Sequence, residues 1–374
     1  MLDLITLPIV WLVFFLLGLI LNNKKKSFQG YALFFISILF IYSYCDYKTT
    51  LLLLSVNAII IFGGYCLFRI NNRLIRIVTL VPMLLFSVGM IFLFLKYKFY
   101  FSKYFLYLPS LSYLGFRSIS YIIYVYKNKK FSLSSSLLQL SFFPIMIMGP
   151  ITRVDDFERD QYYNYDLVLE RLAKGLFMLL IGNMIGSYVI QNISTDISSY
   201  ELWLSAFANS FNIYLLFAGY THLIIGLGLL VGIKLPENFN NPYISTSVSE
   251  FWRRWHMSLS FWIRDFLYIP LGGNRYGLVR KILHIMFAMI VCGLWHGISY
   301  NFFIWGLYHG FFISIESVMD NFGFSPLRKF VPNRFYVPLK IIITFLITMI
   351  SWIFFSYKID DAILFLKIMF SLNE

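Results

Sequence analysis

Apolar runs of membrane-spanning length follow one another along most of this chain, and they restrict the folds open to it. Residues 4–21, 51–68 and 77–95 are three of them, and each can cross a hydrocarbon layer of about 30 Å as a helix. Hydrophobic residues make up 59% of the 374, with a mean hydropathy of +0.72. Because backbone groups in lipid must be bonded within the chain, we expect an all-α polytopic membrane protein of roughly nine to eleven transmembrane or re-entrant helices with interfacial helices.

The positive charge of the chain lies mostly between these runs. There are 31 Lys and Arg residues against 18 Asp and Glu, a formal net charge of +13. The basic residues fall in short turns, where they anchor helix ends and set orientation. This placement indicates the lipid bilayer as the partner and argues against nucleic acid. The turns at residues 24–26 and 69–76 predict a cytoplasmic location for both, with the N-terminus outside. The run at 4–21 lacks a basic leader and a cleavage site, so we expect it to be a retained span.

Two stretches depart from simple spans, although no linker or repeat divides the chain and we expect one membrane domain over residues 1–374. Residues 141–153, SFFPIMIMGPITR, are interrupted by two prolines and a glycine and are too short to cross. They predict a broken, re-entrant segment that is buried in protein or lines a wet cavity, with Arg153 beside the substrate path; a proline-broken interfacial loop is the alternative. The run at 202–233 is too long for one untilted span and is expected to break near residues 219–222.

Residues 236–310 concentrate the polar and aromatic groups that lipid does not explain. The segment around His256 predicts one helix with an aromatic face, too polar to span and suited to the membrane interface. The residues of this face recur at steps of three and four: Trp252, Trp255, Leu259, Trp262 and Phe266.

His296 occupies a different setting, after the apolar run 282–294 and between Gly293 and Gly297, which allow close approach of other groups. An ionisable residue in a span is costly and favours a functional site. The alternative is that His296 is a packed core residue and that His256 bonds a backbone carbonyl. No metal site is expected, because His284, His296 and His309 share no helical face and no HExxH occurs.

Three segments carry a resemblance to a known family. They are PENFNNPY at 236–243, FWRRWHMSLSFWIRDFLYIPLGGNR at 251–275, and GLWHG followed by WGLYHG within 293–310. In order and spacing they resemble the membrane-bound O-acyltransferase family, specifically its bacterial branch that O-acetylates polysaccharides, typified by alginate O-acetyltransferase.

This resemblance implies the family's membrane fold and particular roles for the histidines. His296 matches the family's catalytic position and His256 its second hallmark position. FRSISYIIYVY at 116–126 is also similar, although Tyr124 and His222 stand where the family tends to carry Asp. Longer relatives continue beyond the end of this chain, so a terminal span is expected to be missing.

The implied function is transfer of an acyl group, acetyl by expectation, from a thioester donor such as acetyl-CoA to hydroxyls of an exported polysaccharide. A thioester is already activated, so a neutral buried imidazole suffices as base, and neither an ATP site nor a tightly bound cofactor is needed. His296 would take the hydroxyl proton, while His256 orients it or donates to the thioester oxygen. Four residues are expected along the substrate path: Arg153, Asn238, Arg254 and Trp295.

The expected location is the bacterial inner membrane, with an extracytoplasmic acyltransferase or a polysaccharide as partner. Three alternatives remain. Related family members transfer D-alanine toward teichoic acids, although LYIPLGGNR at 267–275 favours the acetylating branch. A transporter or channel would use the broken segments and histidines as a path, and a non-catalytic scaffold would tolerate loss of both histidines.

Overall fold

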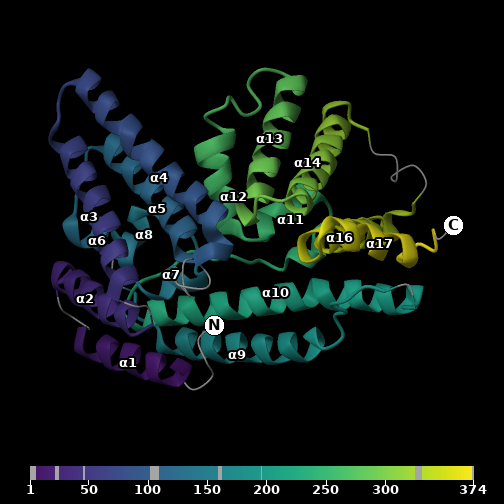
Figure 1. The fold of residues 1–374 in the computed structure, drawn as a ribbon, viewed down its shortest axis with the longest axis horizontal. Helices are drawn as coiled ribbons and strands as arrows, with labels where there is room; N and C mark the ends of the chain where they lie inside the picture. The colour runs from purple at the N-terminus through teal and green to yellow at the C-terminus, as the bar shows by residue number, and fades with distance from the viewer. Residues whose placement is uncertain are drawn as a thin grey trace. The chain divides into compact units, whose positions relative to one another are not determined.

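The computed structural model describes residues 6–21, 25–44, 47–101, 109–158, 162–194, 196–324 and 331–372, and every regular element within them is a helix (Figure 1). Six of the described helices are long and apolar enough to cross a membrane, which confirms the all-α membrane class. The predicted nine to eleven counted re-entrant segments as well. The six spans are Thr50–Arg69, Arg73–Leu93, Ser199–Leu230, Leu278–His296, Tyr300–Asn321 and Arg334–Ser356.

The chain folds into two compact units. The first comprises Met1–Leu176 with Tyr220–Glu237, and the second comprises Phe177–Gly219 with Asn238–Glu374. Helices α9 (Tyr165–Gly186) and α10 (Ser199–Leu230) contribute residues to both. The single membrane domain stays a prediction.

The first unit begins with long apolar helices and continues with short ones. In chain order they are α1 (Thr6–Leu21), α2 (Lys26–Tyr44), α3 (Tyr47–Arg69), α4 (Arg73–Phe101), α5 (Pro109–Asn128), α6 (Leu133–Ser141), α7 (Pro144–Met148) and α8 (Val154–Glu158). Arg117 of α5 is fully buried and donates to the carbonyl of Gln139 in α6 at 3.2 Å, while the Gln139 amide donates back to the Arg117 carbonyl at 3.3 Å. This exchange gives the buried cation one partner outside its own helix and joins the two helices, while Arg117 Nη2 has no hydrogen-bond partner within the described residues.

The predicted break in residues 141–153 is confirmed. Helix α6 ends at Ser141, α7 starts at Pro144, and the chain from Gly149 to Arg153 is not helical. Gly149 and Pro150 are buried, so this irregular backbone is covered by protein, as membrane depth requires.

The predicted break near residues 219–222 is wrong, because α10 runs unbroken through them. A single glycine does not end a helix whose flanking residues can all be helical. Other glycines of this helix allow close packing: a Cβ on Gly226 would lie 2.5 Å from the Trp11 ring. The chain turns away only at Gly232, where φ is +76°.

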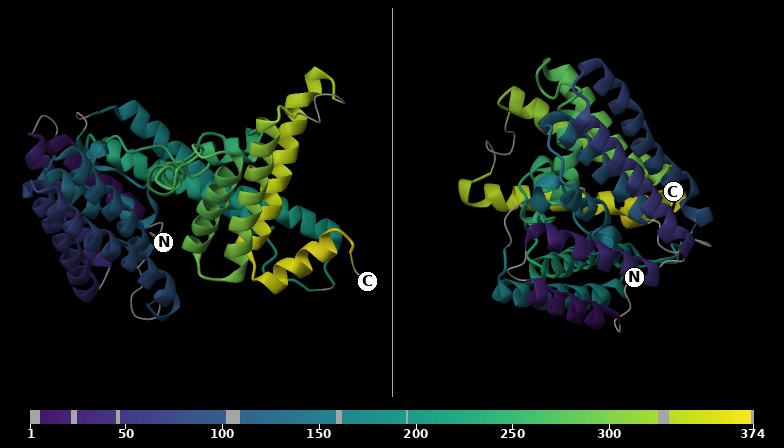
Figure 2. Two further views of the ribbon diagram at one scale, coloured as in Figure 1. Left: turned by 90° about the horizontal axis from the view of Figure 1, so that it is seen from above. Right: turned by 90° about the vertical axis from the view of Figure 1, so that its left-hand side faces the viewer.

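The second unit holds most of the remaining helices, of which α13 and α14 lie side by side (Figures 1 and 2). Their backbones touch: a Cβ on Gly293 would lie 2.2 Å from the Phe302 carbonyl oxygen, and one on Gly306 would lie 2.5 Å from that of Met289. No larger residue fits at either crossing point. The elements are η1 (Pro242–Ile244), α11 (Val248–Arg254), α12 (Met257–Ile263), the π-helical turn η2 (Arg264–Tyr268), α13 (Leu278–His296), α14 (Tyr300–Asn321), α16 (Asn333–Ser356) and α17 (Ile359–Met369).

Candidate active site

The chain around His256 is not the single aromatic helix that the periodicity predicts. Helix α11 ends at Arg254, α12 starts at Met257, and His256 between them has φ 42° and ψ 53°, in the left-handed region. A distant loop causes the break. The Asn240 N–H donates to the Arg254 carbonyl at 3.0 Å, and the Met257 N–H donates to the Asn238 carbonyl at 2.9 Å. These bonds take backbone groups that a continuous helix would pair internally.

The imidazole of His256 is 2% exposed and is held by Asn238. Its Nδ1 lies 3.4 Å from Asn238 Oδ1, which also accepts from the Ser258 hydroxyl at 2.6 Å and the Ser258 N–H at 3.3 Å. The phenyl ring of Phe217 meets the imidazole edge to face, with centroids 4.9 Å apart. Because Asn238 Oδ1 only accepts, Nδ1 carries the proton and Nε2 keeps its lone pair. Within the described part of the chain, that Nε2 atom has no hydrogen-bond partner.

Burial, followed by the electrostatic interaction with the neighbouring His296, lowers the pKa of His256 to about 3. The ring is therefore neutral at physiological pH.

His296 is the last residue of α13 and is enclosed by aromatic rings. The ring centroids of Trp295, Phe355 and Trp305 lie 4.5, 4.9 and 5.4 Å from that of His296. Trp295 also lies 6.3 Å from His256, so one indole contacts both imidazoles. The structure thus brings together His256, His296, Trp295 and Asn238, four of the residues predicted for the site.

The two predicted arginines have structural contacts. Arg254 Nη2 pairs with Glu250 Oε1 at 2.8 Å, and its Nη1 donates to the Asn240 carbonyl at 3.4 Å. Arg153 belongs to the first unit, where its backbone N–H donates to Asp156 Oδ2 at 2.8 Å at the start of α8. A role for either arginine in the substrate path stays a prediction.

Sequence reasoning missed a third histidine in this aromatic cluster. His309 is fully buried, its Nε2 lies 3.0 Å from Ser351 Oγ, and its ring lies 5.0 Å from Trp305 and 5.2 Å from Trp252. The WGLYHG motif was the signal that could have found it. His284, in contrast, bonds the Gly273 carbonyl at 2.9 Å and lies 6.3 Å from the Tyr268 ring, outside this cluster.

The two positions that depart from the family pattern both keep a carboxylate nearby. His222 Nδ1 lies 2.8 Å from Arg171 Nη1, and the same guanidinium binds both oxygens of Glu237 at 3.0 and 2.5 Å. Since a guanidinium only donates, Nδ1 of His222 accepts. The Tyr124 hydroxyl donates to Glu158 Oε2 at 2.7 Å. In each case the acidic group comes from elsewhere in the first unit.

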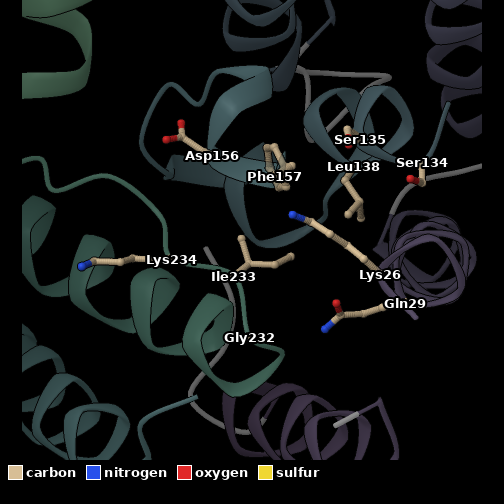
Figure 3. Close-up of a pocket in the computed structure, with 10 residues that line it drawn as sticks. All are labelled: Lys26, Gln29, Ser134, Ser135, Leu138, Asp156, Phe157, Gly232, Ile233 and Lys234. Atoms are coloured by element: carbon tan, nitrogen blue, oxygen red, sulfur yellow. The ribbon is translucent and has the colours of Figure 1, made fainter. Parts of the chain in front are cut away.

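Each unit contains a cavity. The one in the first unit has a volume of about 20 Å³, and Figure 3 shows Lys26, Gln29, Asp156 and Lys234 among the residues around it. It has room for about one water molecule and includes none of the predicted site residues. A larger cleft of about 300 Å³ lies in the second unit between α11, α14 and α16, with Arg253, Glu316 and Lys340 in its walls.

Comparison with known proteins places these observations in a family context. The model of the membrane-bound O-acyltransferase (MBOAT) family matches residues 4–359. "Probable alginate O-acetylase AlgI" of Pseudomonas aeruginosa is 37% identical over 261 residues, which cover 66% of this chain and 48% of that protein. "Peptidoglycan O-acetyltransferase" of Helicobacter pylori is 36% identical over 265 residues, with 65% and 48% covered.

A third relative belongs to another branch. "Teichoic acid D-alanyltransferase" of Bacillus subtilis is 31% identical over 273 residues, which cover 66% of this chain and 68% of that protein. The matched region spans about half the length of the acetylating relatives, with 48 to 54% of each covered.

Proposed function

We propose that this chain, which belongs to the membrane-bound O-acyltransferase family, transfers an acetyl group from a thioester donor such as acetyl-CoA to hydroxyls of an exported cell-surface polysaccharide. The observation that carries the proposal is the meeting of the buried His256 and the half-buried His296 around Trp295 within one aromatic cluster. Two of the acetylating relatives named above are 36 and 37% identical, against 31% for the D-alanylating one, which favours acetyl as the acyl group.

In the proposed reaction His296 acts as the general base. Its imidazole takes the proton of the acceptor hydroxyl as that oxygen attacks the thioester carbonyl. A carbon–oxygen bond forms, the carbon–sulfur bond breaks, and the departing thiolate takes the proton back from His296. A base positioned in this way typically raises the rate of the chemical step by ~100-fold to 10,000-fold.

His256 has a different role in this scheme. Because its Nδ1–H points to Asn238, the free Nε2 lone pair can accept a hydrogen bond but cannot donate one. We therefore favour the orienting role for His256, in which Nε2 accepts from the hydroxyl or from His296, over donation to the thioester oxygen.

The distribution of charge along α13 and α14 supports an acceptor outside the cell. Arg280 and Lys281 lie near the start of α13, and Arg334 lies at the start of α16, close in sequence to the end of α14. The turn at residues 297–299, after His296, carries no charge. Since basic ends face the cytoplasm, the His296 end faces outward, as in an inner-membrane enzyme that acts with an extracytoplasmic acyltransferase or directly on a polysaccharide.

D-alanyl transfer is the second candidate, favoured by the match to the teichoic acid enzyme. One experiment separates the two. A deletion strain is complemented with the wild-type gene, His296→Gln, His256→Asn, or His284→Gln as control, and its exported polymers are analysed for O-acetyl and D-alanine esters.

We expect acetyl esters with the wild type and with His284→Gln, and their loss with His296→Gln at an unchanged membrane level. If D-alanine esters appeared in place of acetyl esters, the proposed acetyl transfer would be wrong and D-alanyl transfer would take its place. Wild-type esterification with His296→Gln would remove this histidine from the mechanism.

A further inference from the structure

A carboxylate on the spanning helix α14 binds the start of α11. The Val248 N–H donates to Glu316 Oε1 at 2.5 Å, and the Ser249 N–H and hydroxyl donate to Glu316 Oε2 at 2.8 and 2.6 Å. Hydrogen bonds to an ionised acceptor are about twice as strong as neutral ones. An ionisable residue in a span is also costly to keep, which calls for an explanation.

These bonds complete the first turn of α11. The first N–H groups of a helix have no partner within it. Ser247 Oγ accepts from the Glu250 N–H at 3.0 Å, and the N–H groups of Val248 and Ser249 are left for Glu316. Helix α11 has seven residues, too few to be stable alone, so its position depends on what binds it.

The other face of α11 belongs to the aromatic cluster. Trp252 lies 5.6 Å from Trp305 and 5.2 Å from His309, measured between ring centroids. After α11 ends at Arg254, the second residue is His256, in its left-handed conformation. A shift at the start of this short helix is therefore carried to the imidazole at its end.

We propose that Glu316 is a positioning residue for acyl transfer, whose carboxylate fixes α11 and thereby places His256. We call the bonds from Val248 and Ser249 to the Glu316 carboxylate the clamp on α11. The role in transfer rests on the proposed function, whereas the clamp does not.

The chain offers a matched control one helical turn away. Asp320 is exposed, lies on the same helix and lines the same cleft, but makes no bond to α11. Glu316→Gln and Asp320→Asn each remove one negative charge at nearly constant size. If the negative charge of the cleft were responsible, both variants would change exchange and kcat alike. If the clamp is responsible, only Glu316→Gln changes them.

The first measurement does not require activity. Hydrogen exchange by mass spectrometry is recorded on the purified full chain in lipid nanodiscs, comparing peptides that cover 246–258 with peptides from α13. We expect Glu316→Gln to speed exchange in 246–258 by ~10-fold to 100-fold, the equivalent of one charge-assisted hydrogen bond. Exchange in α13 should remain as in the wild type, and Asp320→Asn should change neither region.

The second measurement is thiol release from acetyl-CoA by the same samples, with fragments of the cell's own exported polysaccharide as acceptor. We expect Glu316→Gln to lower kcat about 10-fold with the KM for acetyl-CoA unchanged, and Asp320→Asn to match the wild type. Unchanged exchange in 246–258, or an equal rise in α13, would overturn the clamp. Faster exchange confined to 246–258 with wild-type kcat would overturn the positioning role.

Discussion

Acidification should destabilise the folded chain through His256. The ordinary pKa of 6.5 falls to about 3 in the folded state, because the ring is buried and lies near His296. Between these values the unfolded chain binds a proton that the folded chain does not. The contribution of the neutral His256 ring to the free energy of unfolding is thus fully present above pH 6.5 and is lost as the pH falls toward 3. From pH 7 to pH 5 the loss works out at about 2 kcal/mol.

The variant His256→Asn isolates this contribution, since asparagine does not titrate and also tolerates the left-handed conformation. Thermal denaturation of both proteins is followed in the same detergent at pH 7 and pH 5. The wild type should lose about 2 to 3 °C more than the variant over this interval, given the unfolding entropy of a chain of this length. Because other titrating groups are common to both proteins, the difference belongs to His256. An equal loss would refute the reasoning, as it would mean that the ring can charge without cost.

Three further outcomes follow from the packing. Asn238→Leu should lower stability by about 1 to 3 kcal/mol, because buried donors lose their shared acceptor; melting in detergent checks this. Gly306→Ala should cost about 1 to 3 kcal/mol by forcing two helix backbones apart, whereas Gly89→Ala, with open space around the added carbon, should be neutral in the same assay. His222→Leu should reduce the membrane level by leaving a donor of Arg171 without its acceptor, and His222→Asp, which keeps an acceptor, should restore it on a blot.

Much of the architecture could be predicted because its causes are local. Apolar runs define spans wherever lipid is the solvent, and the break in residues 141–153 followed from proline chemistry at Pro144 and Pro150. The site could be predicted in part. His256 and His296 lie 40 positions apart, and nothing in their spacing implies that they meet; the resemblance to a family supplied that.

What could not be predicted depends on partners far away in the sequence. The aromatic periodicity continues through His256, so the break there is invisible without the backbone bonds from Asn238 and Asn240. Glu316 acts on a helix 67 and 68 positions earlier, and the partner of His309 lies 42 positions later. No local pattern encodes such pairs. Conversely, Gly219 suggested a break in α10, but its flanking residues are all helical and one glycine does not end such a helix.

The glycine contact between α13 and α14 also has a mechanical consequence. Two rods whose backbones touch at Gly293 and Gly306 have almost no compliance toward each other, since no flexible side chain lies at the crossing to absorb a displacement. The two helices are therefore expected to move together as one rigid body. Because Phe302 and Phe355 lie against His296, with ring centroids 6.0 and 4.9 Å away, rotation of these phenyl rings can open space around the imidazole without separating the two helices, on the timescale of side-chain motion.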